Sequence, residues 1–479
     1  MPHDQLIHLS ATQALALLRQ REISPLDLVD AALARIEAVN GTVNALVTVC
    51  AERARDHARR LGDTSASASP AEGTLCGLPL AVKDLTPVAG VRTTYGSRIF
   101  ANHVPERSDP VIERIEAAGG IVLAKSNTPE FGASGNTSNE LFGATRNPWD
   151  QTRTAGGSTG GGAAALAAGM VWLATGNDIS GSLRQPASFC GVVGLRPSQG
   201  RVPRPRQSVG YIGLTVEGPM ARTVSDCGLL LDAMSGFDPY DPLSRPSRAG
   251  AFEYAAATPT APRRIAFSPT LDLTVVDPAV ETVCREALAR LANTGVVVEE
   301  DIAPSFASVA KFYPAVRGLD FVARTDTLLA DHRDLLRPEM IQNIEQGTHL
   351  TAVEIGRAER MRMELHQRLT AFFETHDLLV SPAAIVPPPP IDVTHIKALG
   401  EHRFQSHIEW FAITYAISAV PAFPALSLPC GFTVEGLPVG LQLIGKPYDD
   451  AGLLSMARWA ESILGLDSSL PIDPKCPNI

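Results

Sequence analysis

The sequence predicts an α/β fold: a large, mixed and twisted β-sheet that helices cover on both faces. Three observations lead to this prediction. Short apolar segments typical of strands alternate with helical segments along most of the chain, and this alternation favours a sheet between layers of helices. The sequence contains no internal repeat and no break in composition. Its 479 residues are enough for one large α/β core.

We therefore expect a single domain over residues 1–479, without a boundary between separately folding units. Within this domain the sequence distinguishes N-terminal helices, a motif-rich core, a mostly helical region and a C-terminal portion of sheet and helix. These four segments span residues 1–75, 76–235, 236–376 and 377–479.

Three helices are expected near the N-terminus. Ser10 is suited to cap a helix over 11–22, and Ser24 followed by Pro25 is suited to start a second helix that runs to about residue 40. Serine at the cap and proline in the first turn both favour helix initiation. The segment 45–61 predicts the third helix.

The core segment shows a strand–helix–strand rhythm. Short apolar runs predict strands, and amphipathic runs predict helices. The expected strands are 78–84, 121–127 and 170–178, and the expected helices are 109–120 and 223–236.

The alternation continues through the second half of the chain. The expected strands there are 263–268, 296–301, 377–383, 426–432 and 436–445, and the expected helices are about 277–293, most of 305–375, and 451–464. A proline run predicts a loop at 385–393.

The composition disfavours some classes of partner. The net charge of −10 argues against a surface for nucleic acid or anionic lipid. The longest uncharged run, 411–434, is about as long as a membrane span, but three prolines divide it. We therefore expect no membrane span.

The cysteines and the N-terminus favour a cytoplasmic protein. The seven cysteines form no C-x-x-C pair, and their odd number argues against a disulfide framework. The first ten residues have no basic region followed by an apolar one, so we expect no signal peptide.

The glycine-rich segment AGGSTGGGAAALAAG (155–169) does not fit the common phosphate-binding patterns. A P-loop needs a lysine after its glycines, and none follows Gly157. A dinucleotide site needs a strand directly before the glycines, and the preceding residues are not strand-like. A serine hydrolase with a histidine base is also disfavoured, because the G-x-S-x-G elbow is absent.

A buried lysine offers another base. Lys83 lies in the apolar run GLPLAVKD, and desolvation is what makes a lysine basic near neutral pH. The alternatives are an edge-strand lysine or an ion pair with Asp84, although successive side chains of a strand point to opposite faces. Ser182 follows a strand and a Ser-Gly turn, where backbone N–H groups are placed to hold an oxyanion. Such a serine is usually structural when isolated, but together with Lys83 and the glycine-rich loop it predicts a nucleophile.

These motifs resemble those of the amidase signature family. Four stretches carry the resemblance and two support it: GLPLAVKD (77–84), LFGATRNPWD (141–150), AGGSTGGGAAALAAG (155–169), GNDISGSLRQPASFCGVVGLRPSQGRVP (176–203), GPMARTVSDCG (218–228) and GLPVGLQLIG (436–445). The resemblance covers about 75–235 and 377–460. The segment 236–376 carries none of the motifs, and in the family this region commonly shapes the pocket.

The resemblance implies the amidase signature fold and a Ser–Ser–Lys triad whose middle serine follows a cis peptide bond. Matched motif by motif, Lys83 is the expected base, Ser158 the middle serine and Ser182 the nucleophile. The same matching assigns an oxyanion hole to the backbone N–H groups of Ile179, Ser180 and Gly181. It assigns loop-bracing roles to Asp178 and Arg184.

Two positions depart from the family pattern. Thr159 stands where a second serine is usual and keeps a hydroxyl, and Ser180 stands where glycine is usual. We expect the Ser180 side chain to crowd or hydrogen-bond a bound carbonyl. Gly132 and Ser134, in the loop matched to the acyl pocket, are expected near the substrate together with Thr159. The stretch 311–323 suggests an apolar pocket wall, although such stretches are more often core.

The resemblance implies a serine hydrolase that cleaves the carbon–nitrogen bond of a small, apolar or aryl amide through an acyl-enzyme, with no metal and no organic cofactor. Two alternatives stay open: an ester or carbamate hydrolase on the same triad, and the A-type subunit of a glutamine-dependent tRNA amidotransferase. An inactive binding protein is disfavoured, because all three triad positions are filled. We expect a small-molecule substrate, no nucleic acid and no membrane as partners, and leave a homodimer open.

Overall fold

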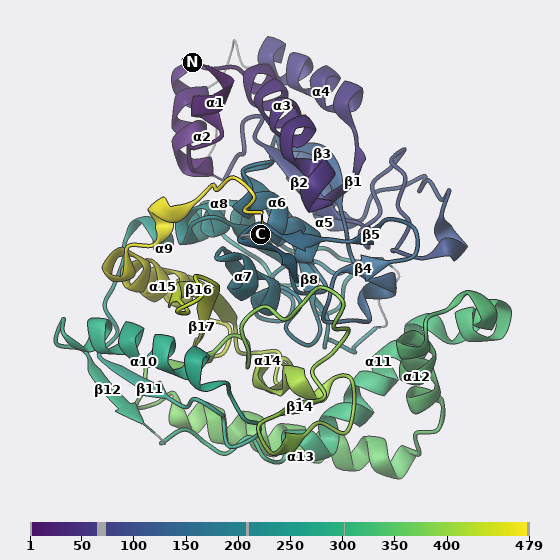
Figure 1. Ribbon diagram of the computed structural model, residues 1–479, viewed down its shortest axis with the longest axis vertical. Helices are drawn as coiled ribbons and strands as arrows, with labels where there is room; N and C mark the ends of the chain where they lie inside the picture. The colour runs from purple at the N-terminus through teal and green to yellow at the C-terminus, as the bar shows by residue number, and fades with distance from the viewer. Residues whose placement is uncertain (1, 65–72, 207–209, 301, 477–479) are drawn as a thin grey trace.

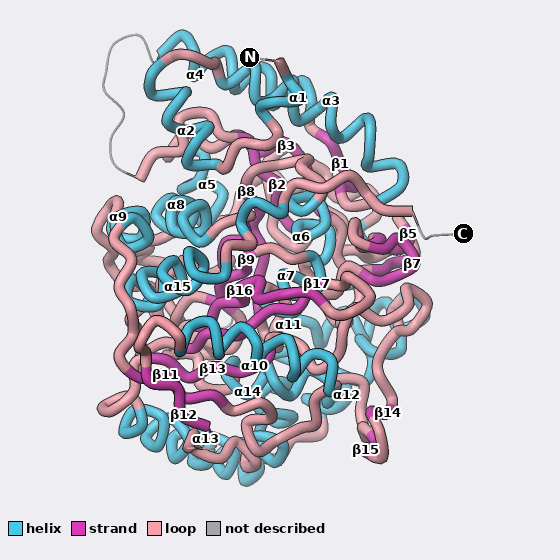
Figure 2. The backbone as a smooth tube through the Cα atoms, turned by 60° about the vertical axis from the view of Figure 1, so that its left-hand side comes forward, coloured by secondary structure: helices cyan, strands magenta, loops and turns pink. Residues whose placement is uncertain are grey.

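One eleven-stranded mixed sheet organises the chain, and helices cover both of its faces (Figures 1 and 2). The computed structural model describes residues 2–64, 73–206, 210–300 and 302–476. In spatial order the strands are β1 (Leu46–Val49), β3 (Ile121–Ser126), β2 (Pro79–Lys83), β8 (Leu173–Asp178), β10 (Val216–Ala221), β9 (Val193–Arg196), β16 (Ala425–Phe432), β17 (Pro438–Ile444), β13 (Leu378–Pro382), β11 (Arg264–Phe267) and β12 (Val297–Glu300). Each of the four sequence segments contributes to this sheet, and the α/β class expected from the sequence is confirmed.

The pairing of the central strands brings two predicted site segments to one edge. Strand β2 is parallel to both β3 and β8, so the carboxyl ends of β2 and β8 lie at the same edge of the sheet. Lys83 is the last residue of β2, and Asp178 is the last residue of β8. Ligands of α/β sheets commonly bind at the carboxyl ends of the strands.

Fifteen α-helices surround the sheet in the part of the chain that the structure describes. They are α1 (His3–Leu6), α2 (Ala11–Gln20), α3 (Pro25–Val43), α4 (Ala51–Thr64), α5 (Pro110–Ala117), α6 (Gly160–Ala167), α7 (Arg184–Cys190), α8 (Val224–Met234), α9 (Ala251–Ala257), α10 (Pro278–Ala292), α11 (Val309–His332), α12 (Pro338–Thr348), α13 (Ala352–Phe372), α14 (Ala412–Ser418) and α15 (Asp450–Leu464). None of the helices described is long and apolar enough to cross a membrane.

The N-terminal predictions are mostly confirmed. Ser10 and Ser24 each form a capping box with the third residue of the helix that follows, which satisfies N–H groups that the first turn leaves unpaired. The single helix expected over 45–61 is wrong, because residues 46–49 form strand β1 before α4 begins. Antiparallel pairing with β3 and three β-branched residues, Val47, Thr48 and Val49, favour the strand over the helix.

Two hydrophobic clusters meet at the predicted site. The first packs the N-terminal helices and α15 against the sheet, and the second surrounds α11, α13 and α14. Strand β8 and the turn after it connect them: Ala174 and Leu183 belong to the first cluster and Ile179 to the second. The turn after β8 is therefore held from both sides by packed apolar side chains.

Helix α6 approaches its neighbours closely enough to require glycine at position 161. A Cβ placed there would lie 2.4 Å from the backbone nitrogen of Asn127 and 2.6 Å from the carbonyl oxygen of Ala45. We expect Gly161→Ala to lower the free energy of unfolding by about 1–3 kcal/mol, because overpacking forces backbone shifts. Thermal unfolding followed by calorimetry measures this effect.

Gly41 provides the matched control. It also lies in a helix, α3, but a Cβ there would meet no atom within 4 Å. Gly41→Ala is expected to raise stability by about 0.5–1 kcal/mol. Equal effects of the two substitutions would contradict the close approach of α6.

Candidate active site

Lys83 ends strand β2 and is fully buried. Its Nζ donates hydrogen bonds to Ser158 Oγ at 2.7 Å, Thr159 Oγ1 at 2.9 Å and Asn177 Oδ1 at 2.8 Å. Burial disfavours the charged ammonium and lowers the pKa of Lys83 to about 7, although two nearby carboxyl groups oppose this shift. Lys83 is therefore able to exist near neutral pH as the neutral amine that a general base must be.

A second buried lysine shows what distinguishes Lys83. Lys125 on β3 lies 3.7 Å from the carboxylate of Asp84 and donates to the carbonyl of Thr86 and to the hydroxyl of Thr93 at 2.9 Å. Asp84 follows Lys83 in the chain and faces Lys125 instead, so the alternative of an ion pair between Lys83 and Asp84 is wrong. The partners of Lys83 are neutral oxygens, whereas Lys125 has a carboxylate as a counterion.

The glycine-rich loop carries Ser158 against a neighbouring loop and helix α7. The peptide bond between Gly157 and Ser158 is cis. A Cβ on Gly157 would lie 2.8 Å from both the carbonyl carbon of Gly135 and the carbonyl oxygen of Ser134, so only glycine fits at this position. The N–H of Gly157 donates to Gln185 Oε1 at 3.1 Å.

Ser182 lies beside this loop. The N–H of Thr159 donates to the carbonyl oxygen of Ser182 at 3.2 Å, and Ser158 and Ser182 are only 2 % and 6 % exposed. The three residues expected to form the triad thus lie in one buried cluster. Lys83 contacts Ser158 directly, and Ser182 is tied to the residue that follows Ser158.

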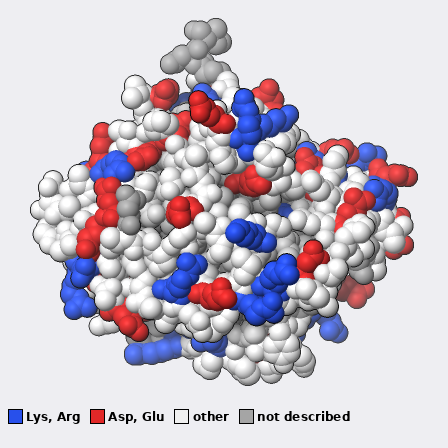
Figure 3. Space-filling model, turned by 90° about the horizontal axis from the view of Figure 1, so that it is seen from below, with Lys and Arg blue, Asp and Glu red and all other residues white. Residues whose placement is uncertain are grey.

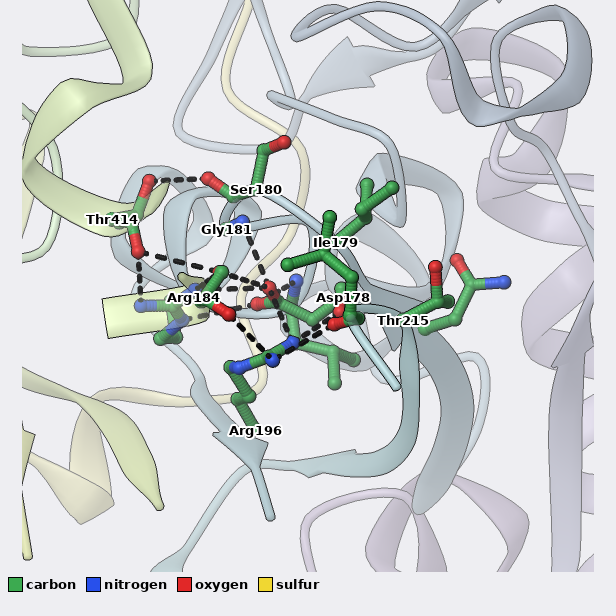
Figure 4. Close-up of polar contacts among 12 residues, drawn as sticks. Asp178, Ile179, Ser180, Gly181, Arg184, Arg196, Thr215 and Thr414 are labelled. Carbon is green, nitrogen blue, oxygen red and sulfur yellow. Dashed lines mark hydrogen bonds and ion pairs between the residues drawn. The ribbon is translucent and has the colours of Figure 1, made fainter. Parts of the chain in front are cut away.

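The carboxylate of Asp178 organises the turn that carries Ser182 (Figure 4). It accepts hydrogen bonds from the N–H groups of Gly181 at 2.8 Å and Leu183 at 3.2 Å, and from Arg184 at 2.9 and 3.0 Å. Arg196 lies 3.4 Å away. Burial alone would raise the pKa of Asp178, but the two guanidinium groups hold that pKa well below its usual range. The bracing roles expected for Asp178 and Arg184 agree with this geometry.

Three successive carbonyl groups of the turn, those of residues 178–180, are held by side chains. They accept hydrogen bonds from Arg196, from the Tyr313 hydroxyl at 2.7 Å and from the Thr414 hydroxyl at 2.7 Å, respectively. In a planar trans peptide the N–H points away from the C=O. The N–H groups of residues 179–181 are therefore directed to the other side of the turn.

One of the three N–H groups expected to form the oxyanion hole already has an acceptor inside the protein. The N–H of Gly181 already donates to Asp178 Oδ1, so it is engaged inside the protein, and its role as an oxyanion donor stays a prediction. Within the described residues, the N–H groups of Ile179, Ser180 and Ser182 have no acceptor. The turn thus has three unoccupied backbone donors.

The hydroxyl of Ser180 is engaged inside the protein. Ser180 Oγ lies 2.6 Å from the hydroxyl oxygen of Tyr313, which also donates to the Ile179 carbonyl. The Tyr313 ring stacks on that of Tyr415 with 4.3 Å between centroids. We expected the Ser180 side chain to crowd or hydrogen-bond a bound carbonyl. In the structure it contacts Tyr313 of helix α11 instead.

Gly132 and Ser134 lie beside the glycine-rich loop. A Cβ on Gly132 would be 3.2 Å from Ser158 Oγ, and the carbonyl of Ser134 packs against Gly157. The structure brings both residues, together with Thr159, into the neighbourhood of the predicted triad.

A cavity of about 350 Å³ opens next to Lys83. Asn177, whose side chain accepts the lysine hydrogen bond, is part of its wall. Phe131 and Phe321 also line it. The apolar wall suggested for 311–323 is therefore present at Phe321, whereas Tyr313 lies in the core.

Sequence reasoning missed several of these residues. Tyr313 and Thr414 carry no local signal, because their roles arise from helices that are distant in the sequence. Asn177 directly precedes Asp178 within the stretch 176–203, but the resemblance assigned no role to it. Glu217 lies within the buried strand β10, and the reasoning that singled out Lys83, a charge within an apolar strand, would have identified it.

Comparisons with known proteins agree on one family. The sequence model of the family described as Amidase matches residues 27–454. An acylamidase of Rhodococcus erythropolis is 34% identical over 476 residues, which cover 99% of each chain. The A-type subunit of the glutamyl-tRNA(Gln) amidotransferase of Moorella thermoacetica is 36% identical over 479 residues, covering 95% of this chain and 96% of its own. The solved structure of a bacterial aryl acylamidase of the amidase signature family has a TM-score of 0.86 at 25% identity, covering 97% of this chain and 99% of its own.

The Tyr313 hydroxyl is expected to stabilise the turn after β8. Tyr313→Phe leaves the buried carbonyl of Ile179 without its donor, which costs about 1–3 kcal/mol. Thermal unfolding measures this loss. In the control Tyr415→Phe, the hydroxyl removed has no hydrogen-bond partner in the described ranges, and little change is expected. Equal destabilisation by the two substitutions would argue against a specific role for the Tyr313 hydroxyl.

Proposed function

The chain belongs to the amidase signature family, and from this premise we propose that it cleaves the carbon–nitrogen bond of a small, apolar or aryl amide. The observation that carries the proposal is the 2.7 Å hydrogen bond between the buried Nζ of Lys83 and Ser158 Oγ. The similarity to an acylamidase and to an aryl acylamidase and the aromatic residues of the adjacent cavity support this substrate class.

In the proposed mechanism, neutral Lys83 accepts the proton of Ser158 while Ser158 accepts that of Ser182. The oxygen of Ser182 attacks the amide carbon, and the carbonyl oxygen gains negative charge. The N–H groups of Ile179, Ser180 and Ser182 stabilise this oxyanion. Removal of one such donor typically costs about 3 kcal/mol of transition-state stabilisation. The same relay returns a proton to the leaving amine, and water then attacks the acyl-enzyme to release the acid and restore Ser182.

The charges beneath the turn favour the same step. Two guanidinium groups, of Arg184 and Arg196, face one carboxylate, that of Asp178. This buried cluster carries a net positive charge directly behind the free N–H groups. A fixed positive charge in a site of low dielectric stabilises a developing oxyanion.

An ester or carbamate hydrolase is compatible with the same machinery, because the nucleophile attacks the same kind of carbonyl carbon. A second candidate, the A-type subunit of a tRNA amidotransferase, is favoured by the 36% identity to one such protein. The net charge of −10 disfavours contact with nucleic acid. On the face shown in Figure 3, basic and acidic side chains lie interspersed.

Ser182→Ala is expected to lower the turnover of an aryl amide such as 4-nitroacetanilide by about 1,000-fold or more, because the nucleophile is lost. Release of 4-nitroaniline measures the rate, and circular dichroism checks the fold. Ser462→Ala, on the exposed side of α15, is the control and should leave the rate unchanged. Turnover retained by folded Ser182→Ala protein would exclude Ser182 as the nucleophile.

The same assay, extended to the matching aryl ester, aryl carbamate and glutamine, separates the candidate functions. We expect cleavage of the aryl amide and no release of ammonia from glutamine by the isolated chain. Glutaminase activity without cleavage of the aryl amide would favour the role in a tRNA amidotransferase instead.

The proposed role of Lys83 as a base predicts how kcat/KM depends on pH. Because a base acts in its neutral form, kcat/KM should be low below a pH of about 7, the pKa of Lys83, and rise to a plateau above it. Lys83→Ala should lower kcat/KM by about 100- to 10,000-fold at every pH. Lys83→Arg keeps a charge and hydrogen-bond donors but cannot become neutral, so it should be equally inactive. A flat profile from acidic to alkaline pH, with chemistry rate-limiting, would rule out a lysine base.

A further inference from the structure

The cavity beside Lys83 contains an acidic feature that the proposed mechanism does not use. It lies where β2 and β8 end and the antiparallel strand β10 begins, with α11 on its other side. Leu85, which lines it, lies close to Ser158, since a Cβ on Gly132 would be 3.0 Å from Leu85 and 3.2 Å from Ser158 Oγ. In Figure 4, Thr215, which also lines the cavity, lies across the Asp178 turn from Thr414.

Two buried carboxyl groups line this cavity and lack a partner for one oxygen each. Glu217 is 1 % exposed and Asp109 is 5 % exposed. Among the residues that the structure describes, Glu217 Oε2 and Asp109 Oδ2 have no hydrogen-bond partner. Glu217 lies directly opposite Asn177 in the pairing of β10 with β8 and bonds its side chain. Buried polar atoms are normally paired, and these two unpaired oxygens belong to residues that line the same cavity.

The arginines of the wall do not satisfy these carboxyl groups. Arg204 is paired with Asp241 at 2.6 Å, and Arg324 is paired with Asp320. Each of these guanidinium groups already has a carboxylate of its own. Neither arginine therefore pairs directly with Glu217 Oε2 or Asp109 Oδ2. Nearby cations act on the two carboxyl groups only at longer range.

Aromatic rings complete the wall. The rings of Tyr95 and Phe100 have centroids 5.1 Å apart, and those of Tyr95 and Phe131 have centroids 6.2 Å apart. The faces of aromatic rings attract organic cations, and desolvation strengthens this attraction. Carboxyl groups set among aromatic rings form an environment that suits an ammonium group better than a metal ion, which prefers a full shell of oxygen ligands.

We propose that this cavity is a subsite for a protonated primary amine carried by the substrate, with Glu217 and Asp109 as its hydrogen-bond acceptors. The substrate class is then an amide whose acyl or amine portion ends in an ammonium group. This inference rests on the proposed function for the reaction itself, whereas the binding of an amine to the cavity does not depend on catalysis.

The charge states of the two carboxyl groups give the subsite a pH dependence. Burial and the nearby Asp109 raise the pKa of Glu217 to about 8, against the opposing effects of Lys83 and Arg324. Burial raises the pKa of Asp109 to about 7, and Glu113 adds to this shift while Lys125 and Arg206 oppose it. A bound ammonium favours the ionised carboxylates, so its binding should release protons and tighten as the pH rises from about 6 to about 8.

Calorimetry with two probes of equal shape tests the subsite without any turnover. Hexylammonium chloride is expected to bind the wild-type protein about tenfold or more tightly than 1-hexanol. Proton release on binding is measured in two buffers of different ionisation enthalpy. Equal affinity for the two probes would overturn the proposal.

Isosteric variants assign the preference to its residues. Glu217→Gln should reduce the preference for hexylammonium to about twofold or less. Asp109→Asn should reduce this preference too. If the Glu217 variant does not fold, the Asp109 variant provides the test, because asparagine is also favourable at the helix N-cap that residue 109 occupies. Glu364→Gln, on the exposed face of α13, is the control and should leave both affinities unchanged. A preference that persists in both cavity variants would exclude these carboxyl groups as the acceptors.

Two pairs of substrates connect the subsite to catalysis. The first pair, 5-aminopentanoyl and hexanoyl 4-nitroanilide, places the ammonium on the acyl portion. The second pair, 4-(aminomethyl)acetanilide and 4-ethylacetanilide, places it on the leaving amine. In one of the two pairs, kcat/KM should be about tenfold higher for the substrate with the ammonium group than for its neutral partner. Glu217→Gln should bring this ratio to about one.

The outcomes separate the two proposals. Hexylammonium binding without cleavage of any anilide would refute the proposed function and leave the subsite supported. Cleavage of the neutral anilides without a preference for either cation, and without preferential binding of hexylammonium, would refute the subsite and leave the proposed function supported.

Discussion

The buried carboxylate of Asp178 is the point on which the architecture of the site depends. It gathers two N–H groups of its own turn and two guanidinium groups. Arg184 then continues to the carbonyl of Thr414, the hydroxyl of Ser418 and the side-chain oxygen of Gln442. Strand β8, helix α14 and strand β17 are thus joined through one negative charge. Such clusters add little net stability, because desolvation offsets much of the attraction. Their effect here is geometric, since they set the direction of each peptide in the turn.

Exclusion of water is what sets Lys83 apart from a surface lysine, because burial lowers its pKa to about 7. Lys83 ends strand β2, which lies between β3 and β8. Its ammonium group contacts three neutral oxygens, so no direct partner neutralises its charge. Lys125, one strand away, is equally buried but keeps a carboxylate within 4 Å. Burial lowers the pKa of both lysines, that of Lys83 to about 7 and that of Lys125 to about 8. The two differ in their direct partners, which are neutral oxygens for Lys83 and include a carboxylate for Lys125.

The sequence alone predicted those helices, strands and site residues that are determined by neighbouring residues in the chain. Alternating patterns placed most strands and helices, the serine caps were identified from their neighbours, and Lys83 stood out as a charge in an apolar strand. The predictions failed where tertiary contacts decide. Strand β1 forms because β3 is available to pair with it. Tyr313 reaches the site from helix α11, more than 130 residues further along the chain, and no local pattern reports such a contact.

The contact between Ser180 and Tyr313 links two parts of the molecule that would otherwise vary independently. Helix α11 contributes Phe321 to the cavity wall and Tyr313 to the turn that leads to Ser182. A chain that exchanges this helix for another, to accept a different substrate, also removes the hydroxyl that partners Ser180. With glycine at position 180, the turn would have no side-chain hydroxyl that needs a partner, so it would no longer depend on the residue at position 313. Positions 180 and 313 should therefore change together when the helix is redesigned or recombined.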